Sequence, residues 1–150
     1  RLQVADVIRR YRPELVLAPM PTDRHPDHAA ASAFVTAGAF WARMARIETD
    51  HAPHSPRAVL YYVMHEAAQP SFVVDISAVW ERKREAIAAY SSQFDRQMPD
   101  GYRFIGTSDY HAAAASRAGY WGQQISCAQG EAYVIAGTLR VDDPVALLAG

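Results

Sequence analysis

ELVLAPMPTDRHPDHAA, residues 14–30, is the stretch that decides the predicted fold. Its first six residues form an apolar run closed by a proline, which is typical of a strand buried on both faces. From Pro26 to Ile47, apolar residues recur at steps of three and four and predict one long helix. A strand, a polar loop and a helix in this order place residues 20–28 beyond the carboxyl end of the strand, where open α/β sheets bind ligands.

The rest of the chain alternates helices and strands. Helical spacing over residues 2–11 ends before Pro13, and β-rich runs at 58–64 and 72–76 predict two further strands. The remaining expected elements are a helix over 77–92 capped by Ser77, a long loop over 95–109, a helix over 109–124 and a strand over 131–137. This order predicts a layered α/β domain with a mostly parallel sheet.

Composition limits the classes of partner and compartment. Fifteen Lys and Arg against sixteen Asp and Glu give a formal net charge of -1, so charge favours neither nucleic acid nor an anionic membrane as partner. No apolar run approaches the roughly 18 to 20 residues that span a bilayer. The single cysteine excludes an internal disulfide framework and favours the cytoplasm. The sequence leaves open whether the protein forms a homo-oligomer.

The two histidines around Pro26 could carry chemistry. With Pro26 in the first helical position, His25 and His28 lie roughly on one side of the first turn. The helix N-terminus favours a neutral His28, the form that binds a metal, and Asp27 is placed to orient His25. The alternative is a helix capped by Asp23 or Asp27 with two solvated histidines, because a catalytic zinc normally needs three protein ligands.

A family resemblance bears on this choice. APMPTDRHPDHAAAS, followed by VLYYVMHE, VVDIS, KREAIAAYSSQF and GEAYVI, resembles the LmbE-like (PIG-L) N-acetylglucosaminyl deacetylases, and within them the bacillithiol-pathway enzymes. The resemblance implies a Rossmann-like α/β fold and one zinc ion per intact subunit. It implies removal of an acetyl group from an amino-sugar conjugate, with N-acetylglucosaminyl malate as the expected substrate. His28 would then be a zinc ligand, His25 would stabilise or protonate the reacting group, and Asp27 would be its partner.

The AHPDD-type motif of that family is absent from this chain. We therefore expect residues 1–150 to be the C-terminal part of one deacetylase domain, with the other zinc ligands and an aspartate general base upstream of Arg1. By itself the chain is expected to be inactive. The alternative is a catalytically silent sugar- or nucleotide-binding module on the same fold, although no glycine-rich phosphate loop supports a nucleotide.

Other residues have a structural interpretation. Lys83 interrupts the apolar stripe of the helix over 77–92, where its amine extends to solvent or reaches an acidic group or substrate. Cys127 has no neighbouring histidine and is expected to be an ordinary packed residue. His51 and His54 are expected at the surface of a proline-containing loop. Tyr110, Tyr120 and Trp121 are expected to pack in the core, with the wall of a sugar site as the alternative. His65 and His111 start or end elements and are assigned no role.

Overall fold

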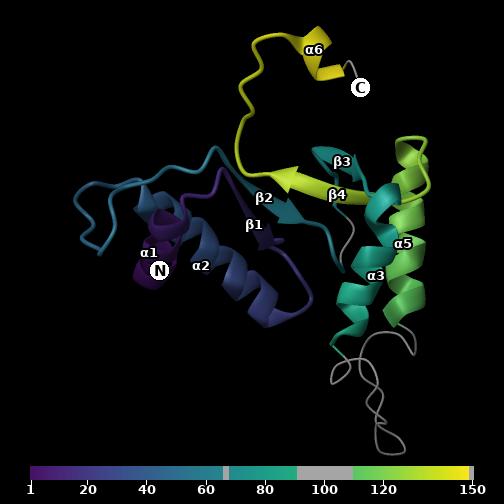
Figure 1. The fold of residues 1–150 in the computed structure, drawn as a ribbon, viewed down its shortest axis with the longest axis horizontal. Coiled ribbons are helices and arrows are strands. Elements are labelled where there is room, and N and C mark those ends of the chain that lie inside the picture. Colours follow the sequence, from purple (N-terminus) through teal and green to yellow (C-terminus); the bar gives the residue numbers. More distant parts are fainter. Residues whose placement is uncertain (66–67, 91–109, 149–150) are drawn as a thin grey trace, which may run out of the picture. The chain divides into compact units, whose positions relative to one another are not determined.

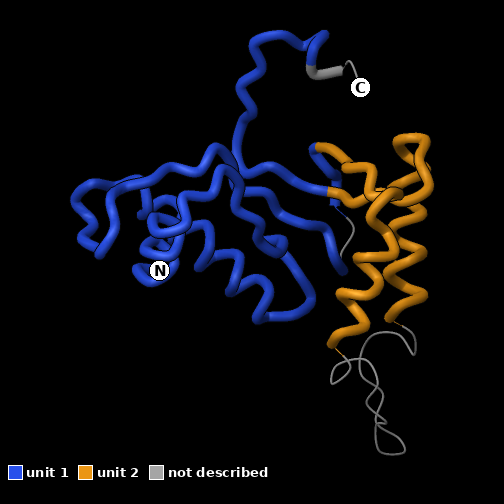
Figure 2. The backbone as a smooth tube through the Cα atoms, in the orientation of Figure 1, with its two compact units in different colours: residues 1–71, 133–150 blue, residues 72–132 orange. Residues whose placement is uncertain are grey.

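The computed structural model describes residues 1–65, 68–90 and 110–148. The chain forms two compact units, one of residues 1–71 with 133–150 and the other of residues 72–132 (Figure 2). The expected loop over 95–109 lies outside the described residues. Among the residues described, no helix has the length and apolar character that crossing a membrane requires.

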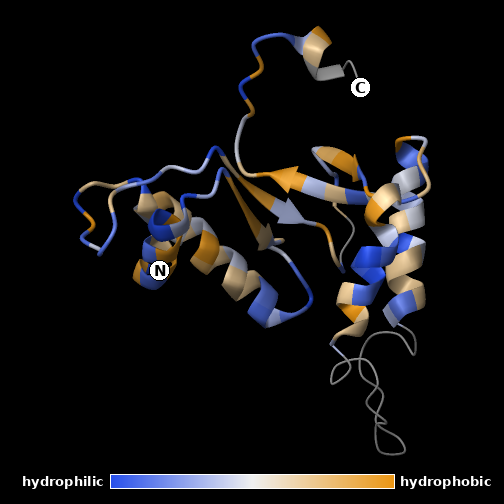
Figure 3. Cartoon of the chain, in the orientation of Figure 1, coloured by the Kyte–Doolittle hydropathy of each residue, from blue (hydrophilic) through white to orange (hydrophobic). Residues whose placement is uncertain are grey.

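The first unit contains the strand and the helix predicted from the opening stretch, together with four other elements among the residues described. They are α1 (Leu2–Tyr11), β1 (Leu15–Pro19), α2 (Pro26–Ala42), β2 (Ala58–Tyr62), α6 (Pro144–Leu148) and the second half of β4 (Gly130–Ile135) (Figure 1). β1 and β2 pair in parallel, with Leu15 opposite Ala58 and Pro19 opposite Tyr62. Figure 3 shows β1 as hydrophobic and the following loop, with the first turn of α2, as largely hydrophilic. The strand, loop and helix of residues 14–30 are therefore present.

The core of this unit joins α1 to α2. A Cβ atom on Gly38 would overlap the side chain of Val4, so the glycine permits a close approach of the two helices. Burying small and branched apolar side chains between them is favourable because their surfaces leave water. The buried cluster consists of Ala5, Ile8, Ala39 and Ala42.

The helix expected over residues 26–47 ends at Ala42, and Arg9 of α1 explains why. Arg9 is 3% exposed. Its guanidinium donates hydrogen bonds to backbone carbonyls at this end of the helix. Nε donates to the carbonyl of Ala42 at 2.9 Å, and Nη2 donates to the carbonyl of Met44 at 2.8 Å. Nη1 donates to the carbonyl of Ile47 at 2.8 Å. A buried cation with several donors satisfies carbonyls that would otherwise continue the helical ladder.

The second unit holds β3 (Phe72–Asp75), the single turn η1 (Ser77–Val79), α3 (Trp80–Ala88), α5 (Tyr110–Gln124) and the first half of β4. The predicted cap at Ser77 is wrong, because α3 begins at Trp80 without a side-chain cap. Ser77 Oγ instead accepts a hydrogen bond from the backbone N–H of Gln129 at 3.1 Å.

The sheet has the strand order β1-β2-β4-β3 and is mixed. β2 pairs antiparallel with β4, with Leu60 opposite Ile135. Hydrogen bonds at the two ends of β3 show that it also runs antiparallel to β4. The Ser71 N–H donates to the carbonyl of Tyr133, and the Ile76 N–H donates to the carbonyl of Gln129. The expectation of a mostly parallel sheet is therefore not supported, although the α/β class is. An apolar run does not show the direction of a strand. The expectation that β1 is buried on both faces is also wrong in this structure, because Leu15 and Leu17 are 52% and 53% exposed.

Candidate metal and catalytic site

The polar residues of the opening stretch gather at one edge of the sheet. β1 ends at Pro19 and β2 ends at Tyr62, and the two strands are parallel and in register. Their carboxyl ends therefore lie side by side. Asp23 and His28 follow β1, whereas His65 follows β2. Local sequence patterns connect the first two residues, but only the strand pairing brings the third beside them.

The start of α2 is capped by a histidine and not by either aspartate. His25 is the N-cap residue, and its Nδ1 accepts the backbone N–H of Asp27 at 3.2 Å. Pro26 follows in the first helical position. Because Nδ1 acts as an acceptor, the neutral ring of His25 carries its proton on Nε2. The backbone N–H of His25 donates to Asp23 Oδ1 at 2.8 Å, which fixes the chain as it enters the helix.

His28 lies between two other imidazole rings. The ring of His25 stacks on it with a centroid separation of 4.7 Å and an interplanar angle of 24°. The ring of His65 lies 5.6 Å from that of His28 and within 9° of parallel. His28 is therefore in contact with both of the histidines nearest to it in the site.

A buried carboxylate faces the ring of His28. Asp23 Oδ1 lies 3.1 Å from His28 Nδ1, and the Asp23 side chain is 1% exposed. Despite this distance, His28 Nδ1 is buried and makes no well-aligned hydrogen bond with any residue that the structure describes. The Asp23 carboxylate is therefore the charged neighbour of this ring nitrogen in the structure.

The surroundings of Asp23 favour its ionised form. Burial by itself would raise the pKa of Asp23, but the backbone N–H of His25 and the ring of His28 outweigh burial and lower it below the ordinary value of 3.8. The nearby phenol of Tyr62 has a raised pKa because it is partly buried and because Asp23 is negative. Asp23 is therefore a carboxylate at neutral pH.

The donor set fits a transition metal. One ligand atom from each of Asp23, His28 and His65 lies within 4.8 Å of the others. A carboxylate with two imidazoles is a typical donor set for zinc. Neither Asp23 nor His65 was predicted from the sequence to be a metal ligand. A signal was present, because each follows the carboxyl end of a predicted buried strand by a few residues.

Asp27, the expected partner of His25, makes a longer contact. Its Oδ2 lies 4.0 Å from His25 Nδ1, and the two side chains are 87% and 49% exposed. The nearer contact of that ring nitrogen is the backbone N–H of Asp27, not its carboxylate. In the structure the Asp27 carboxylate therefore does not hold the ring of His25. It lies close enough to approach the ring.

The other residues considered from sequence have structural contacts. His51 Nδ1 lies 2.9 Å from Asp6 Oδ1, and His54 Nε2 lies 2.8 Å from the carbonyl of Pro13, so both are tied to the segment around α1. In the second unit, the amine of Lys83 pairs with Glu131. Burial raises the pKa of the Cys127 thiol, which keeps it protonated and unreactive at neutral pH.

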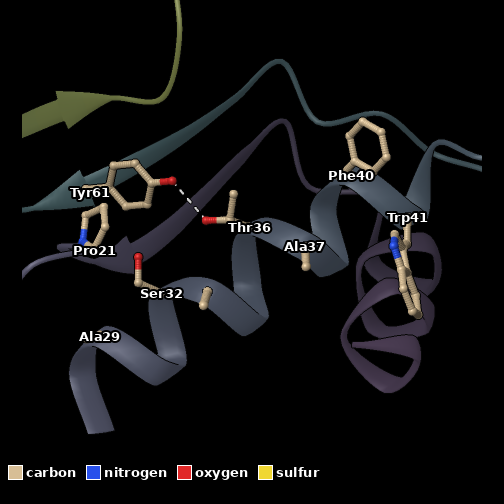
Figure 4. Close-up of a pocket in the computed structure, with 9 residues that line it drawn as sticks. Pro21, Ala29, Ser32, Thr36, Ala37, Phe40, Trp41 and Tyr61 are labelled. Carbon is tan, nitrogen blue, oxygen red and sulfur yellow. Dashed lines mark hydrogen bonds between the residues drawn. The ribbon is translucent and has the colours of Figure 1, made fainter. Parts of the chain in front are cut away.

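A largely apolar cavity of about 460 Å³ runs along α2 (Figure 4). None of Asp23, His28 and His65 lines it, although the lining residue Ala29 follows His28 in the sequence. Thr36 Oγ1 and Tyr61 Oη form a 2.9 Å hydrogen bond in its wall, and the buried Ser32 Oγ has no partner among the described residues. The lining residues are Pro21, Ala29, Ser32, Ala33, Thr36, Ala37, Phe40, Trp41 and Tyr61.

Comparison with known proteins found similarity to a deacetylase. No family model matches the chain. A diacetylchitobiose deacetylase of Thermococcus kodakarensis is 34% identical over 102 residues, which cover 63% of this chain and 37% of that relative. This similarity supports the deacetylase family. The chain thus spans well under half the length of the curated deacetylase that it matches.

Solved structures agree on the fold. A conserved protein of Thermus thermophilus is 32% identical with a TM-score of 0.78, over 93% of this chain and 59% of that one. A 4-carboxy-2-hydroxymuconate hydratase of Pseudomonas putida (TM-score 0.73, 19% identity) matches 95% of this chain and 60% of its own. An N,N'-diacetylchitobiose deacetylase of Pyrococcus horikoshii (TM-score 0.69, 22% identity) matches over 89% of this chain and 49% of its own. The last two show the fold alone, since deacetylase and hydratase share it.

Proposed function

We propose that this chain is part of a zinc-dependent hydrolase that removes the acetyl group from an N-acetylglucosaminyl substrate. The observation that carries the proposal is the meeting of a buried carboxylate with stacked imidazoles at the carboxyl ends of β1 and β2, in a chain similar to a deacetylase. The resemblance to the LmbE-like family implies an aspartate general base, which this proposal would place upstream of Arg1.

His28 is the proposed zinc ligand. Its ring is fixed between His25 and His65, and its buried Nδ1 lacks a hydrogen-bond partner among the described residues. A bound zinc ion would polarise the acetamide carbonyl and make a water molecule more acidic. A ring already fixed in orientation loses little conformational entropy when it binds a metal.

His25 is the proposed catalytic residue of this segment. Its side chain is 49% exposed, so substrate can reach it. The neutral ring carries its proton on Nε2, which can donate to the carbonyl oxygen as negative charge develops there. When the ring is protonated, Nδ1 can no longer accept from the Asp27 backbone and can donate to the Asp27 carboxylate. Asp27 would thus stabilise the charged ring, which can pass a proton to the departing amine.

The substrate follows from the resemblance. Within the LmbE-like family, the likeness to bacillithiol-pathway enzymes favours N-acetylglucosaminyl malate, in the cytoplasm. The products would be acetate and the free glucosamine amine. Diacetylchitobiose, the substrate named for the Thermococcus relative, is the second compound to test.

The test is acetate release by the protein that includes its upstream residues. We expect release from N-acetylglucosaminyl malate, loss of activity with a chelator, and recovery when zinc is restored. His28→Ala should lose both metal and activity. The alternative, a silent sugar-binding module, predicts that the same protein binds the sugar in a calorimeter and releases no acetate from either compound. That result would end the proposal.

A further inference from the structure

We propose that Arg24 selects a substrate whose amino sugar carries a carboxylate, and that its guanidinium binds this carboxylate. The inference rests on the proposed function and deepens it, because it names the charge of the conjugate that the enzyme prefers. It also separates the two candidate compounds, since N-acetylglucosaminyl malate is an anion and diacetylchitobiose is uncharged. Arg24 is thus assigned as a residue that determines specificity.

Arg24 lies at the edge of the sheet that holds the proposed reacting groups. It directly precedes His25, and its side chain extends to the segment after β2, where Nη2 donates to His65 Nδ1 at 3.5 Å. The ring of His65 in turn stacks on that of His28, with a centroid separation of 5.6 Å. Arg24 and His25 are both exposed. A substrate that reaches the ring of His25 can therefore also reach the guanidinium.

The guanidinium of Arg24 keeps most of its hydrogen-bonding capacity. An arginine side chain offers five N–H donors. Within residues 1–65, 68–90 and 110–148, its contact with His65 is the one side-chain hydrogen bond of Arg24, and its length of 3.5 Å is at the outer limit for such a bond. A neutral ring nitrogen is also a weaker partner than a carboxylate. The other N–H groups are available to a ligand.

The two carboxylates nearest to Arg24 in the sequence do not neutralise it. Asp23 Oδ1 accepts the backbone N–H of His25 at 2.8 Å, and the Asp23 side chain is 1% exposed. The Asp27 carboxylate lies 4.0 Å from the ring of His25. Arg24 forms no ion pair with any carboxylate in the part of the chain that the structure describes. An unpaired cation beside a site that binds substrate favours an anionic ligand.

The chemistry of the substrate brings a carboxylate to this region. In a 2-acetamido sugar, the acetamide and the group at the anomeric carbon are attached to adjacent ring carbons. When the acetamide carbonyl accepts from His25, the attached group therefore lies beside that ring. The planar guanidinium of Arg24 can donate two parallel hydrogen bonds to one carboxylate. This carboxylate takes no part in the bond that breaks, so the contact acts on binding and not on the chemical step.

The expected preference is moderate because Arg24 is exposed. Water and salt screen an exposed ion pair, whereas paired hydrogen bonds to a charged group strengthen it. We expect the intact enzyme to favour a carboxylate-bearing substrate by on the order of tenfold in kcat/KM. Higher salt concentration should reduce this preference.

The test compares one substrate with and without its charge, in the protein that includes its upstream residues. Acetate release is measured for N-acetylglucosaminyl malate and for its dimethyl ester, which has nearly the same shape and no carboxylate. Arg24→Gln should raise KM for the acid on the order of tenfold and leave kcat within about twofold. For the ester, both constants should stay within about twofold. The preference for the acid should thus disappear.

Arg43→Gln is the matched control. It makes the same change in net charge, but Arg43 is the exposed C-cap residue at the other end of α2, where its guanidinium lies 4.3 Å from the centroid of the Phe40 ring. This variant should keep the preference of the wild type within about twofold. Circular dichroism checks that both variants are folded.

Three results would overturn the inference and leave the deacetylase function standing. They are equal rates of the wild type on acid and ester, equal losses on both substrates in Arg24→Gln, and a preference that depends on Arg24 but is larger for N-acetylglucosamine 1-phosphate. The second result would assign Arg24 to the positioning of His65. If no compound releases acetate, the proposed function fails, and calorimetry then decides the role of Arg24. Tighter binding of the acid than of the ester, lost in Arg24→Gln, would support it, and equal binding would overturn it.

Discussion

Arg9 reaches from α1 to the carbonyl oxygen of Ala42, the last residue of α2, and donates to it from Nε at 2.9 Å. The same guanidinium donates to the backbone of Met44 and Ile47. One buried side chain thus fixes the end of the helix whose other end carries the candidate site.

Replacing this side chain should destabilise the fold. Arg9→Met keeps most of the volume but removes the buried donors to the carbonyls of Ala42, Met44 and Ile47, so we expect a loss of about 2–4 kcal/mol in the free energy of unfolding. Arg10→Met is the control, because Arg10 is exposed on the same helix, and it should change that free energy by less than about 0.5 kcal/mol. Urea denaturation measures both. Equal losses in the two variants would show that the carbonyl contacts of Arg9 contribute little.

The cap and the catalytic role of His25 can be separated by one substitution. Asparagine is a good N-cap residue but lacks the Nε2 donor. In the enzyme with its upstream residues, His25→Asn should keep zinc and stability while kcat falls on the order of a hundredfold and KM stays within a few-fold. His25→Ala should lose a further ~1 kcal/mol of stability. Activity of His25→Asn close to that of the wild type would leave His25 a helix cap only.

Asp27→Asn tests the partner of His25. It removes the charge that would stabilise the protonated ring but keeps the backbone N–H that His25 accepts. We expect kcat to fall in the same direction as for His25→Asn, and the double variant to be little worse than His25→Asn, because the two residues would act as one unit. Multiplied losses of kcat in the double variant would contradict this pairing.

Stability in acid should report on Asp23. Burial raises the pKa of this group, but the His25 N–H and the His28 ring together lower it below 3.8 in the folded chain. A depressed pKa stabilises the fold above the unfolded value and is lost as the pH falls through the folded value. With chelator present, the wild type should therefore lose its advantage over Asp23→Asn below about pH 4. Urea denaturation at a series of pH values measures this, and a constant difference between the two proteins down to acid pH would contradict it.

Local patterns in the sequence predicted most of the elements and part of the site. The apolar run before Pro19 and the spacing after Pro26 predicted β1 and the start of α2, because both elements are set by residues near one another in the sequence. The end of α2 was predicted too late, since it is set by Arg9 from another helix. The same holds for His65, whose approach to His28 depends on the pairing of β1 with β2. The antiparallel direction of β4 likewise has no local signal.

A single oxygen, Asp23 Oδ1, accepts the backbone N–H of His25 and lies 3.1 Å from His28 Nδ1. A change that moves this oxygen toward the His28 ring weakens its hydrogen bond with the backbone N–H of His25 at the start of α2. The two contacts are thermodynamically linked, so each changes the other by the same free energy. The hydrogen-exchange rate of the His25 amide should therefore report changes in the contact between Asp23 and the His28 ring.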